Sequence, residues 1–214
     1  NTLMLIMTYG AADAMGLNSH IVLNLAAVLF ILPFLLFSAL AGQIADKYEK
    51  SALIRRIKLL EIIIMLAGAA ALLTESYVVL LILLFLMGAQ SAFFGPCKYA
   101  ILPQHLNRNE LVGGNALVEM GTFVSILLAT IGAGVILQFD NYLTIASIMV
   151  VLLAACGYLS SYFIPQAPAV DSAIKLDFNI LKSSFNLISY ARNNRGIYLA
   201  ILAISWFWFL GASY

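Results

Sequence analysis

Apolar residues occur in runs of membrane-spanning length along most of this chain, and short polar segments separate the runs. A helix that crosses a hydrocarbon core about 30 Å thick needs roughly 20 predominantly apolar residues, because each residue adds about 1.5 Å. Six segments satisfy this requirement and predict spanning helices: 19–45, 52–73, 77–102, 111–139, 142–164 and 196–214. Segment 1–12 is apolar but covers only about 18 Å as a helix, so we interpret it as the second half of a cut helix.

A more polar connection precedes the last apolar segment. Pro165 and Pro168 mark a linker, and Asp177 is a candidate helix start. The apolar residues that follow recur at steps of four and three, which predicts an amphipathic helix on the membrane surface or against the bundle: Ile174, Phe178, Leu181, Phe185 and Ile188. We interpret this helix as a tether rather than a partner-binding element. The expected parts are an N-terminal bundle with a truncated first helix, a cytoplasmic linker and a seventh spanning helix: 1–164, 165–195 and 196–214.

Composition supports a polytopic membrane protein, because 63% of the residues are hydrophobic and only 10% are charged. Cys97 and Cys156 lie in predicted spans and form no C-x-x-C pair, so they indicate neither a disulfide nor a metal site. Motifs for a signal peptide, a phosphate-binding loop, hydrolysis or nucleic-acid binding are absent, and a net charge of +1 implies no polyanionic partner. We expect no cofactor. Since the chain lacks an initiator Met and stops inside an apolar run, we expect a piece of a longer protein.

The basic residues fall on one side of the predicted topology. If 1–12 belongs to helix one, alternate connections hold all eleven Lys and Arg residues, and the opposite connections hold only Asp13, Glu75 and Asp140. The positive-inside rule therefore predicts that the basic connections are cytoplasmic. Topology alone is one explanation for the densest basic cluster, which contains Lys47, Lys50, Arg55, Arg56 and Lys58.

A gate is the second explanation for this cluster. Gly42-x-x-x-Asp46-Lys47 closes the second predicted helix, and a short basic turn opens the third. The pattern resembles the signature of the major facilitator superfamily, in which a further Gly and two basic residues follow. Here Glu49 replaces that Gly, Lys50 matches a basic position, and the next residue does not. The resemblance implies that Gly42, Asp46, Lys47 and Lys50 hold a cytoplasmic gate; alternatively, Asp46 only caps the third helix.

Charged residues within predicted spans are candidate functional residues, because a charge near the bilayer centre costs about 3 kcal/mol or more unless it faces protein or water. These residues are Glu61, Lys98 and Glu119. Glu61 lies close after Lys58, so we interpret it as a paired or snorkelling residue near the interface. Pro96 removes a backbone hydrogen bond just before Lys98, so we expect a bend there and a pocket beside the cation.

The helix predicted at 111–139 has two distinct faces. Glu119 shares one face with Asn115 and Thr122, which predicts a helix that lines a cavity. Small residues on another face predict close packing against a neighbouring helix: Gly121, Ser125, Ala129 and Ala133. The alternative to a binding role is a structural ion pair between Lys98 and Glu119.

A closer resemblance rests on segments 46–48, GPCKYAILPQHL at 95–106 and ELVGGNALVEMGTF at 110–123, together with ISWFWFLGASY at 204–214. These segments resemble the bacterial lysophospholipid transporter family of the major facilitators. They are most similar to the version that forms the N-terminal domain of proteins also carrying acyltransferase and AMP-binding ligase domains. The similarity covers nearly all 214 residues. It implies an all-α membrane protein, the N-terminal six-helix bundle of a major facilitator plus the start of the second bundle.

The resemblance also implies a function, namely the inward movement of lysophospholipid, chiefly lysophosphatidylethanolamine, across the bacterial inner membrane for reacylation. In the family, a Lys-Tyr pair on helix four lies at the head-group site, and Lys98 and Tyr99 match it. An Asp-Asn pair on helix one would precede Asn1. Lys98 offers a cation for the phosphate, while Glu119, with Asn115 on the same face, offers an anion for an amine. The expected partners are lysophospholipid, membrane lipid and a cytoplasmic acyltransferase, fused or separate.

Two other functions compete with lipid transport. A facilitator for a soluble metabolite or drug would need a more polar cavity and often a carboxylate on helix one or four, and the fourth predicted helix has none. The chain could instead anchor acyltransferase domains to the membrane. Neither alternative predicts a catalytic residue in this chain.

Overall fold

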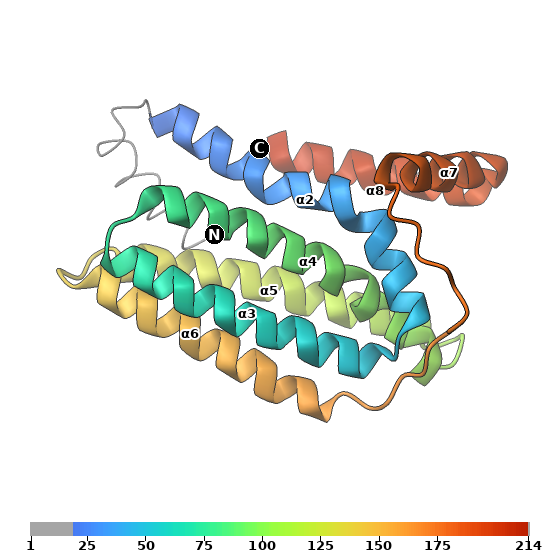
Figure 1. The fold of residues 1–214 in the computed structure, drawn as a ribbon, viewed down its shortest axis with the longest axis horizontal. Coiled ribbons are helices and arrows are strands. Elements are labelled where there is room, and N and C mark those ends of the chain that lie inside the picture. Colours follow the sequence, from blue (N-terminus) through green and yellow to red (C-terminus); the bar gives the residue numbers. More distant parts are fainter. Residues whose placement is uncertain (1–18, 214) are drawn as a thin grey trace.

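The computed structural model describes residues 19–213, and Figure 1 shows their arrangement. This part of the chain contains α-helices, one short 3-10 helix and no strand. The elements are α2 (Ser19–Lys47), α3 (Lys50–Leu73), α4 (Tyr77–His105), α5 (Leu111–Ile136), α6 (Tyr142–Ser160), η1 (Ser161–Phe163), α7 (Ile180–Asn193) and α8 (Arg195–Ser213).

The helices follow the predicted segments closely and differ from them at the ends. α3 begins at Lys50 rather than at residue 52, and α4 continues to His105 rather than ending at 102. α5 ends at Ile136 instead of 139, and the last residues of the predicted span 142–164 form η1. The predicted fragment 1–12 lies outside the described residues. The division into parts at 164 and 195 stays a prediction.

Within residues 19–213, four helices are long and apolar enough to cross a membrane: His20–Lys47, Tyr77–His105, Leu111–Ile136 and Tyr142–Phe163. The sequence predicted six. The first half of α3 carries Arg55, Arg56, Lys58 and Glu61, and the apolar part of α8, Arg195–Gly211, is shorter. α3 nevertheless packs against both α4 and α6, so it belongs to the same bundle. The chain is therefore a multi-pass membrane protein.

The bundle core lies between α2, α3, α4 and α6, where small residues alternate with large aliphatic ones. α2 and α4 approach closely at Gly88, where a Cβ atom would collide with the carbonyl oxygen of Phe30. A second buried cluster, nearer the α2–α3 connection, contains Ala45, Ile54, Ile57 and Cys97. Both clusters tie α3 and α4 together, so these helices form a rigid base for side chains that point elsewhere.

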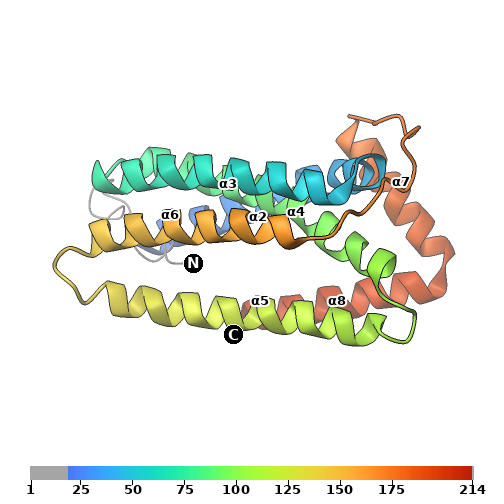
Figure 2. The ribbon, with the colours of Figure 1, turned by 90° about the horizontal axis from the view of Figure 1, so that it is seen from below.

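α5 stands apart from α3 and α6 along most of its length, on the side of α8 (Figure 2). Only Ala133 of the predicted small-residue ladder is buried, while Gly121, Ser125 and Ala129 are exposed. The predicted packing of these three residues against another helix is therefore not seen within residues 19–213. The reason is that α5 contacts α4 and α6 sparsely in this part of the chain.

The amphipathic helix begins later than predicted. α7 starts at Ile180 because the Asn179 side chain accepts a hydrogen bond from the Lys182 N–H. Asp177 lies before the helix, and its own N–H donates to the Gln43 side chain at the end of α2. α7 packs against α2 and buries Ser183 and Ala191. Its large apolar side chains Phe185 and Ile188 face away, as expected for a helix at a membrane surface.

Candidate functional site

α4 and α5 bring the predicted head-group residues together. The Tyr99 hydroxyl donates a hydrogen bond to Glu119 Oε1. Lys98 Nζ donates to Thr122 Oγ1 at 3.3 Å and lies 4.7 Å from the centre of the Tyr99 ring. A cation, an anion and two hydroxyl groups therefore meet where the C-terminal half of α4 faces the first half of α5.

The expected ion-pair alternative is not what the structure shows. In the part of the chain that is described, no ion pair joins Lys98 to Glu119; each charged group is engaged by a hydroxyl instead. A lysine ammonium has three donors, and a carboxylate has two acceptor oxygens. Since Thr122 uses one donor and Tyr99 one oxygen, both charged groups keep hydrogen-bonding capacity for a ligand.

A cavity of about 930 Å³ opens beside this cluster, between α5 and α8. Tyr99, Asn115 and Glu119 form its polar end, and the rest of its lining is apolar and aromatic: Phe123, Ala203, Ile204, Phe207 and Trp208. Its volume lies within the range of about 300–1,000 Å³ that small-molecule sites occupy. Of the four predicted binding residues, three line the cavity, and Lys98 lies next to it through its contacts with Tyr99 and Thr122.

The aromatic wall of this cavity comes from residues to which the sequence assigned no role. The rings of Phe123 and Trp208 stack with their centres 5.9 Å apart and connect α5 to α8. The Trp-Phe-Trp-Phe run at 206–209 was a usable signal, because aromatic residues supply large apolar surface at binding sites. Asn115 has less hydrogen-bonding capacity for a ligand than its position suggests, because its side-chain amide donates to the Leu111 carbonyl of its own helix at 2.8 Å.

The predicted gate residues do not form one cluster. The Asp46 carbonyl accepts hydrogen bonds from the N–H groups of Val170 and Asp171, while Lys50 is fully buried and its Nζ donates to the Pro168 carbonyl at 3.1 Å. Lys47 Nζ instead lies 5.9 Å from the centre of the Tyr48 ring.

The structure also shows how the ends of the gate motif are placed. A Cβ atom built at Gly42 would meet no atom within 4 Å, so Gly42 makes no close backbone contact in the described chain. Asp46 does not cap α3, because the helix begins at Lys50 and the residue before it, Glu49, is the cap. The Glu49 carboxylate accepts from the N–H groups of Ser51 at 3.0 Å and Ala52 at 2.6 Å.

Glu49 also receives a hydrogen bond from the backbone N–H of Ala167 at 2.9 Å. Burial alone would raise the pKa of the Glu49 carboxyl. Hydrogen bonds to the charged form outweigh burial and lower its pKa from 4.5 to about 2; the donors are the Ser51 hydroxyl and the backbone N–H groups of Ala167, Ala52 and Ser51. Glu49 is therefore ionised at neutral pH and holds the linker against the start of α3.

The interpretation of Glu61 as a paired residue is confirmed. Glu61 Oε2 lies 2.8 Å from Lys58 Nζ and accepts a second hydrogen bond from the Gln90 side chain at 2.9 Å. Lys58 Nζ also lies 4.8 Å from the centre of the Phe94 ring. These contacts join α3 to α4 and compensate both charges within the bundle.

Comparison with known proteins agrees with this architecture. The family model for the Major Facilitator Superfamily matches residues 1–214. The chain is 28% identical to a lysophospholipid transporter LplT from Photorhabdus laumondii over 185 residues, which are 86% of this chain and 44% of that protein. It is 26% identical to the LplT of Enterobacter sp. strain 638 over 187 residues, 87% of this chain and 45% of that protein. It is 32% identical to the LplT of Salmonella arizonae over 143 residues, which are 66% of this chain and 34% of that protein.

The chain thus spans less than half the length of these relatives. The expected fold class, the N-terminal bundle of a major facilitator followed by the start of the second bundle, is confirmed. Because the family model covers the whole sequence, the chain belongs to the Major Facilitator Superfamily.

Proposed function

We propose that this chain supplies the head-group site of a secondary transporter for lysophospholipid. The observation that carries the proposal is the cavity beside α4 and α5, which has charged and polar groups at one end and an aromatic wall along the other. A lysophospholipid has a phosphate that needs a cation and a single acyl chain that needs an apolar wall. A soluble metabolite would make little use of Phe123, Phe207 and Trp208. The names of the curated relatives support the same substrate class.

Each part of the substrate has a counterpart in the site. Lys98 binds the phosphate, because a charge-assisted hydrogen bond in a water-poor cavity is worth more than the roughly 1 kcal/mol of a neutral one. Glu119 binds the amine of a head group such as ethanolamine, and Tyr99 positions the Glu119 carboxylate through its hydroxyl. Asn115 lines the polar end of the cavity beside them. The acyl chain lies along the aromatic wall.

Transport proceeds by alternating access in the bacterial inner membrane, with the basic connections in the cytoplasm. Gly42, Asp46, Lys47 and Lys50 lie at the cytoplasmic gate. The substrate is chiefly lysophosphatidylethanolamine, and a cytoplasmic acyltransferase, fused or separate, reacylates it. These assignments rest on the sequence resemblance and on the charge distribution among the connections.

The test is lysophospholipid uptake by full-length protein in proteoliposomes, with the melting temperature measured in parallel. We expect Lys98→Ala to lower uptake at least tenfold and Lys98→Arg to retain a part of it, because arginine keeps the charge but changes the geometry. Glu119→Gln and Tyr99→Phe should reduce the preference for head groups that carry an amine. Lys182→Ala is the matched control, because Lys182 is an exposed cation on α7 outside the site.

A normally folded Lys98→Ala variant that transports at the wild-type rate would contradict the site assignment. If Lys98→Ala and Glu119→Gln each lower the melting temperature and the double variant restores it, the two residues act as a structural pair. That result would also contradict the proposal.

A further inference from the structure

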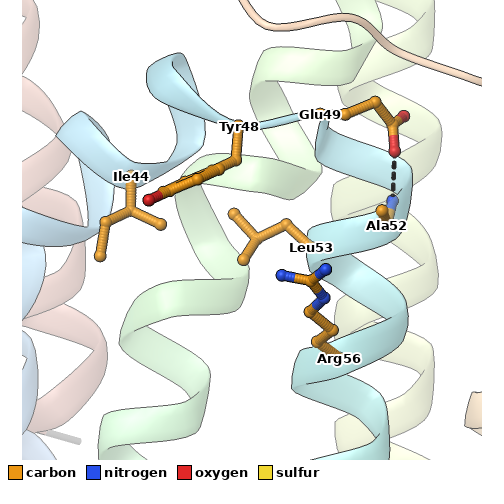
Figure 3. A pocket seen from close by; sticks show the side chains of 6 residues that line it. All are labelled: Ile44, Tyr48, Glu49, Ala52, Leu53 and Arg56. Carbon is orange, nitrogen blue, oxygen red and sulfur yellow. Dashed lines mark hydrogen bonds between the residues drawn. The ribbon is translucent and has the colours of Figure 1, made fainter. Parts of the chain in front are cut away.

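Two adjoining hollows lie next to the α2–α3 connection and share no lining residue with the cavity between α5 and α8. The first has a volume of about 380 Å³ and is lined by Tyr48, Glu49 and Ala52 together with three shared residues (Figure 3). The second, of about 320 Å³, runs between apolar side chains of α3 and α4, among them Leu60, Ile64, Leu86 and Phe93. The residues that line both hollows are Ile44, Leu53 and Arg56. The hollows therefore form one groove with a polar end and an apolar body.

The polar end of this groove holds a cation with no protein partner. Arg56 is exposed, and within residues 19–213 its guanidinium forms no hydrogen bond, ion pair or ring contact. The other members of the basic cluster all have partners. Lys47 lies over the Tyr48 ring, and Lys50 donates to the Pro168 carbonyl. Arg55 contacts the Ser51 hydroxyl and the Tyr162 ring, and Lys58 pairs with the Glu61 carboxylate. Arg56 alone among them is free to bind an anion from outside the described chain.

The neighbouring groups favour an anion at this position. In Figure 3 the Arg56 guanidinium points into the first hollow beside Leu53, while the Tyr48 ring borders the hollow with its hydroxyl directed toward Ile44. Glu49 also lines this hollow, but its carboxylate turns toward Ala52, to which it is hydrogen-bonded at 2.6 Å. The acidic group therefore accepts hydrogen bonds from the backbone, and the donors of Arg56 remain available.

The apolar body of the groove has the dimensions of an acyl chain. It follows α3 from Leu53 to Ile64, which is about 16 Å of helix at about 1.5 Å per residue. Leu60 is half exposed, with 48% of its surface accessible, so the groove is open along its side. An apolar groove that opens from a membrane-spanning bundle, with a free arginine at the end where basic residues cluster, matches a lipid in shape and in charge.

We propose that this groove binds a membrane phospholipid, with the phosphate on Arg56 and one acyl chain between α3 and α4. A guanidinium recognises phosphate through paired hydrogen bonds. The site is separate from the proposed transport cavity, because the two share no lining residue and only the groove contains residues of the α2–α3 connection. A bound lipid would hold this connection, directly after Asp46 and Lys47, and so regulate the gate.

The proposal is tested on delipidated full-length protein in detergent micelles, by the shift in melting temperature on adding phosphatidylglycerol. We expect a clear upward shift for the wild type, loss of most of it in Arg56→Gln, and partial retention in Arg56→Lys. Leu60→Gln should weaken the shift as well, because it makes the apolar body polar. Arg108→Gln is the matched control, since Arg108 is an exposed cation in the connection after α4 and lines neither hollow.

Three further measurements separate the sources of the effect. Inorganic phosphate and diacylglycerol should each fail to reproduce the shift; a full shift with either compound would overturn the proposal, because only one half of the lipid would be needed. Lys98→Ala should keep the shift in melting temperature, so this measurement tests lipid binding in the groove independently of the proposed transport site. An unchanged shift in Arg56→Gln would overturn the proposal. It would equally fail if a Leu60→Cys variant, without Cys97 and Cys156, resisted N-ethylmaleimide in lipid-free micelles, because protein would then cover the groove.

Discussion

Glu49 and Ala167 are 118 residues apart in the sequence, and yet the Glu49 carboxylate accepts a hydrogen bond from the Ala167 N–H at 2.9 Å. The Lys50 N–H returns a bond of the same length to the Ala167 carbonyl. The Pro168 carbonyl receives further hydrogen bonds from Lys50 Nζ and from the Gln104 side chain. The linker after α6 is thereby joined to the α2–α3 connection and to the end of α4. Movement of one of these segments requires movement of the others.

Loss of the Glu49 charge should destabilise the protein in a pH-dependent manner. Glu49→Gln is expected to cost about 1 kcal/mol at neutral pH, because a helix cap and a charge-assisted hydrogen bond are weakened. The pKa of Glu49 is about 2 in the folded protein and 4.5 ordinarily, so its stabilising effect is complete above pH 4.5 and is lost as the pH falls toward 2. Between pH 7 and pH 3, the difference in melting temperature between the two proteins should therefore stay constant down to about pH 5 and shrink below pH 4.5.

The control for this measurement is Glu75→Gln, since Glu75 is an exposed side chain on the opposite side of the membrane in the predicted topology. A constant difference in melting temperature between wild type and Glu49→Gln across the pH range would contradict the role of the carboxylate.

A methyl group at Gly88 should disrupt the packing of α2 on α4. In Gly88→Ala, the new Cβ would collide with the Phe30 carbonyl oxygen and crowd the Pro33 ring, so the helices must move apart. We expect a loss of about 1–3 kcal/mol, which is typical of an overpacked core. Gly68→Ala is the matched control, because a Cβ there meets no atom within 4 Å and alanine is the better helix former. Equal melting temperatures for the two variants would refute this account.

The Asp46 carboxylate should affect transport without affecting folding. Its carbonyl oxygen, rather than its side chain, accepts the hydrogen bonds from Val170 and Asp171, so Asp46→Asn leaves these contacts intact. If the carboxylate acts at the gate, lysophospholipid uptake by the full-length variant should fall several-fold while the melting temperature stays the same. Asp140→Asn, an exposed carboxylate in the connection between α5 and α6, should transport normally. Wild-type uptake by Asp46→Asn would mean that the basic cluster only sets topology.

Membrane topology can be checked by cysteine labelling after Cys97 and Cys156 are replaced. Lys50 is a poor position for this purpose because its side chain is fully buried, whereas Lys182 and Asp140 are both exposed. An impermeant maleimide should label Lys182→Cys only in inside-out vesicles and Asp140→Cys only in right-side-out vesicles, because the basic connections are expected in the cytoplasm. Labelling in the reverse pattern would invert the topology, and with it the direction of transport.

The sequence alone was sufficient to locate the helices approximately and to name the residue types of the candidate site. Apolar runs of spanning length predict helices because the bilayer offers the backbone no hydrogen-bond partners, so each segment must satisfy its own. Lys98 and Glu119 were conspicuous because a charge in an apolar run is costly without a function or a partner. The pairing of Glu61 with Lys58 was also predictable, since residues three apart on a helix lie on one face.

Contacts between residues far apart in the chain depended on tertiary structure. The order of apolar residues does not specify which helices pack together, so the predicted packing of the small-residue face of α5 is not found within residues 19–213. For the same reason, the sequence could not predict the aromatic wall that α8 contributes, the hydrogen bond from Tyr99 to Glu119, or the burial of Lys50 beneath the linker. A spanning helix forms from local hydrogen bonds and from contact with lipid. A binding site forms only where side chains of several helices meet, and their separation and direction are set by the packing of the whole bundle.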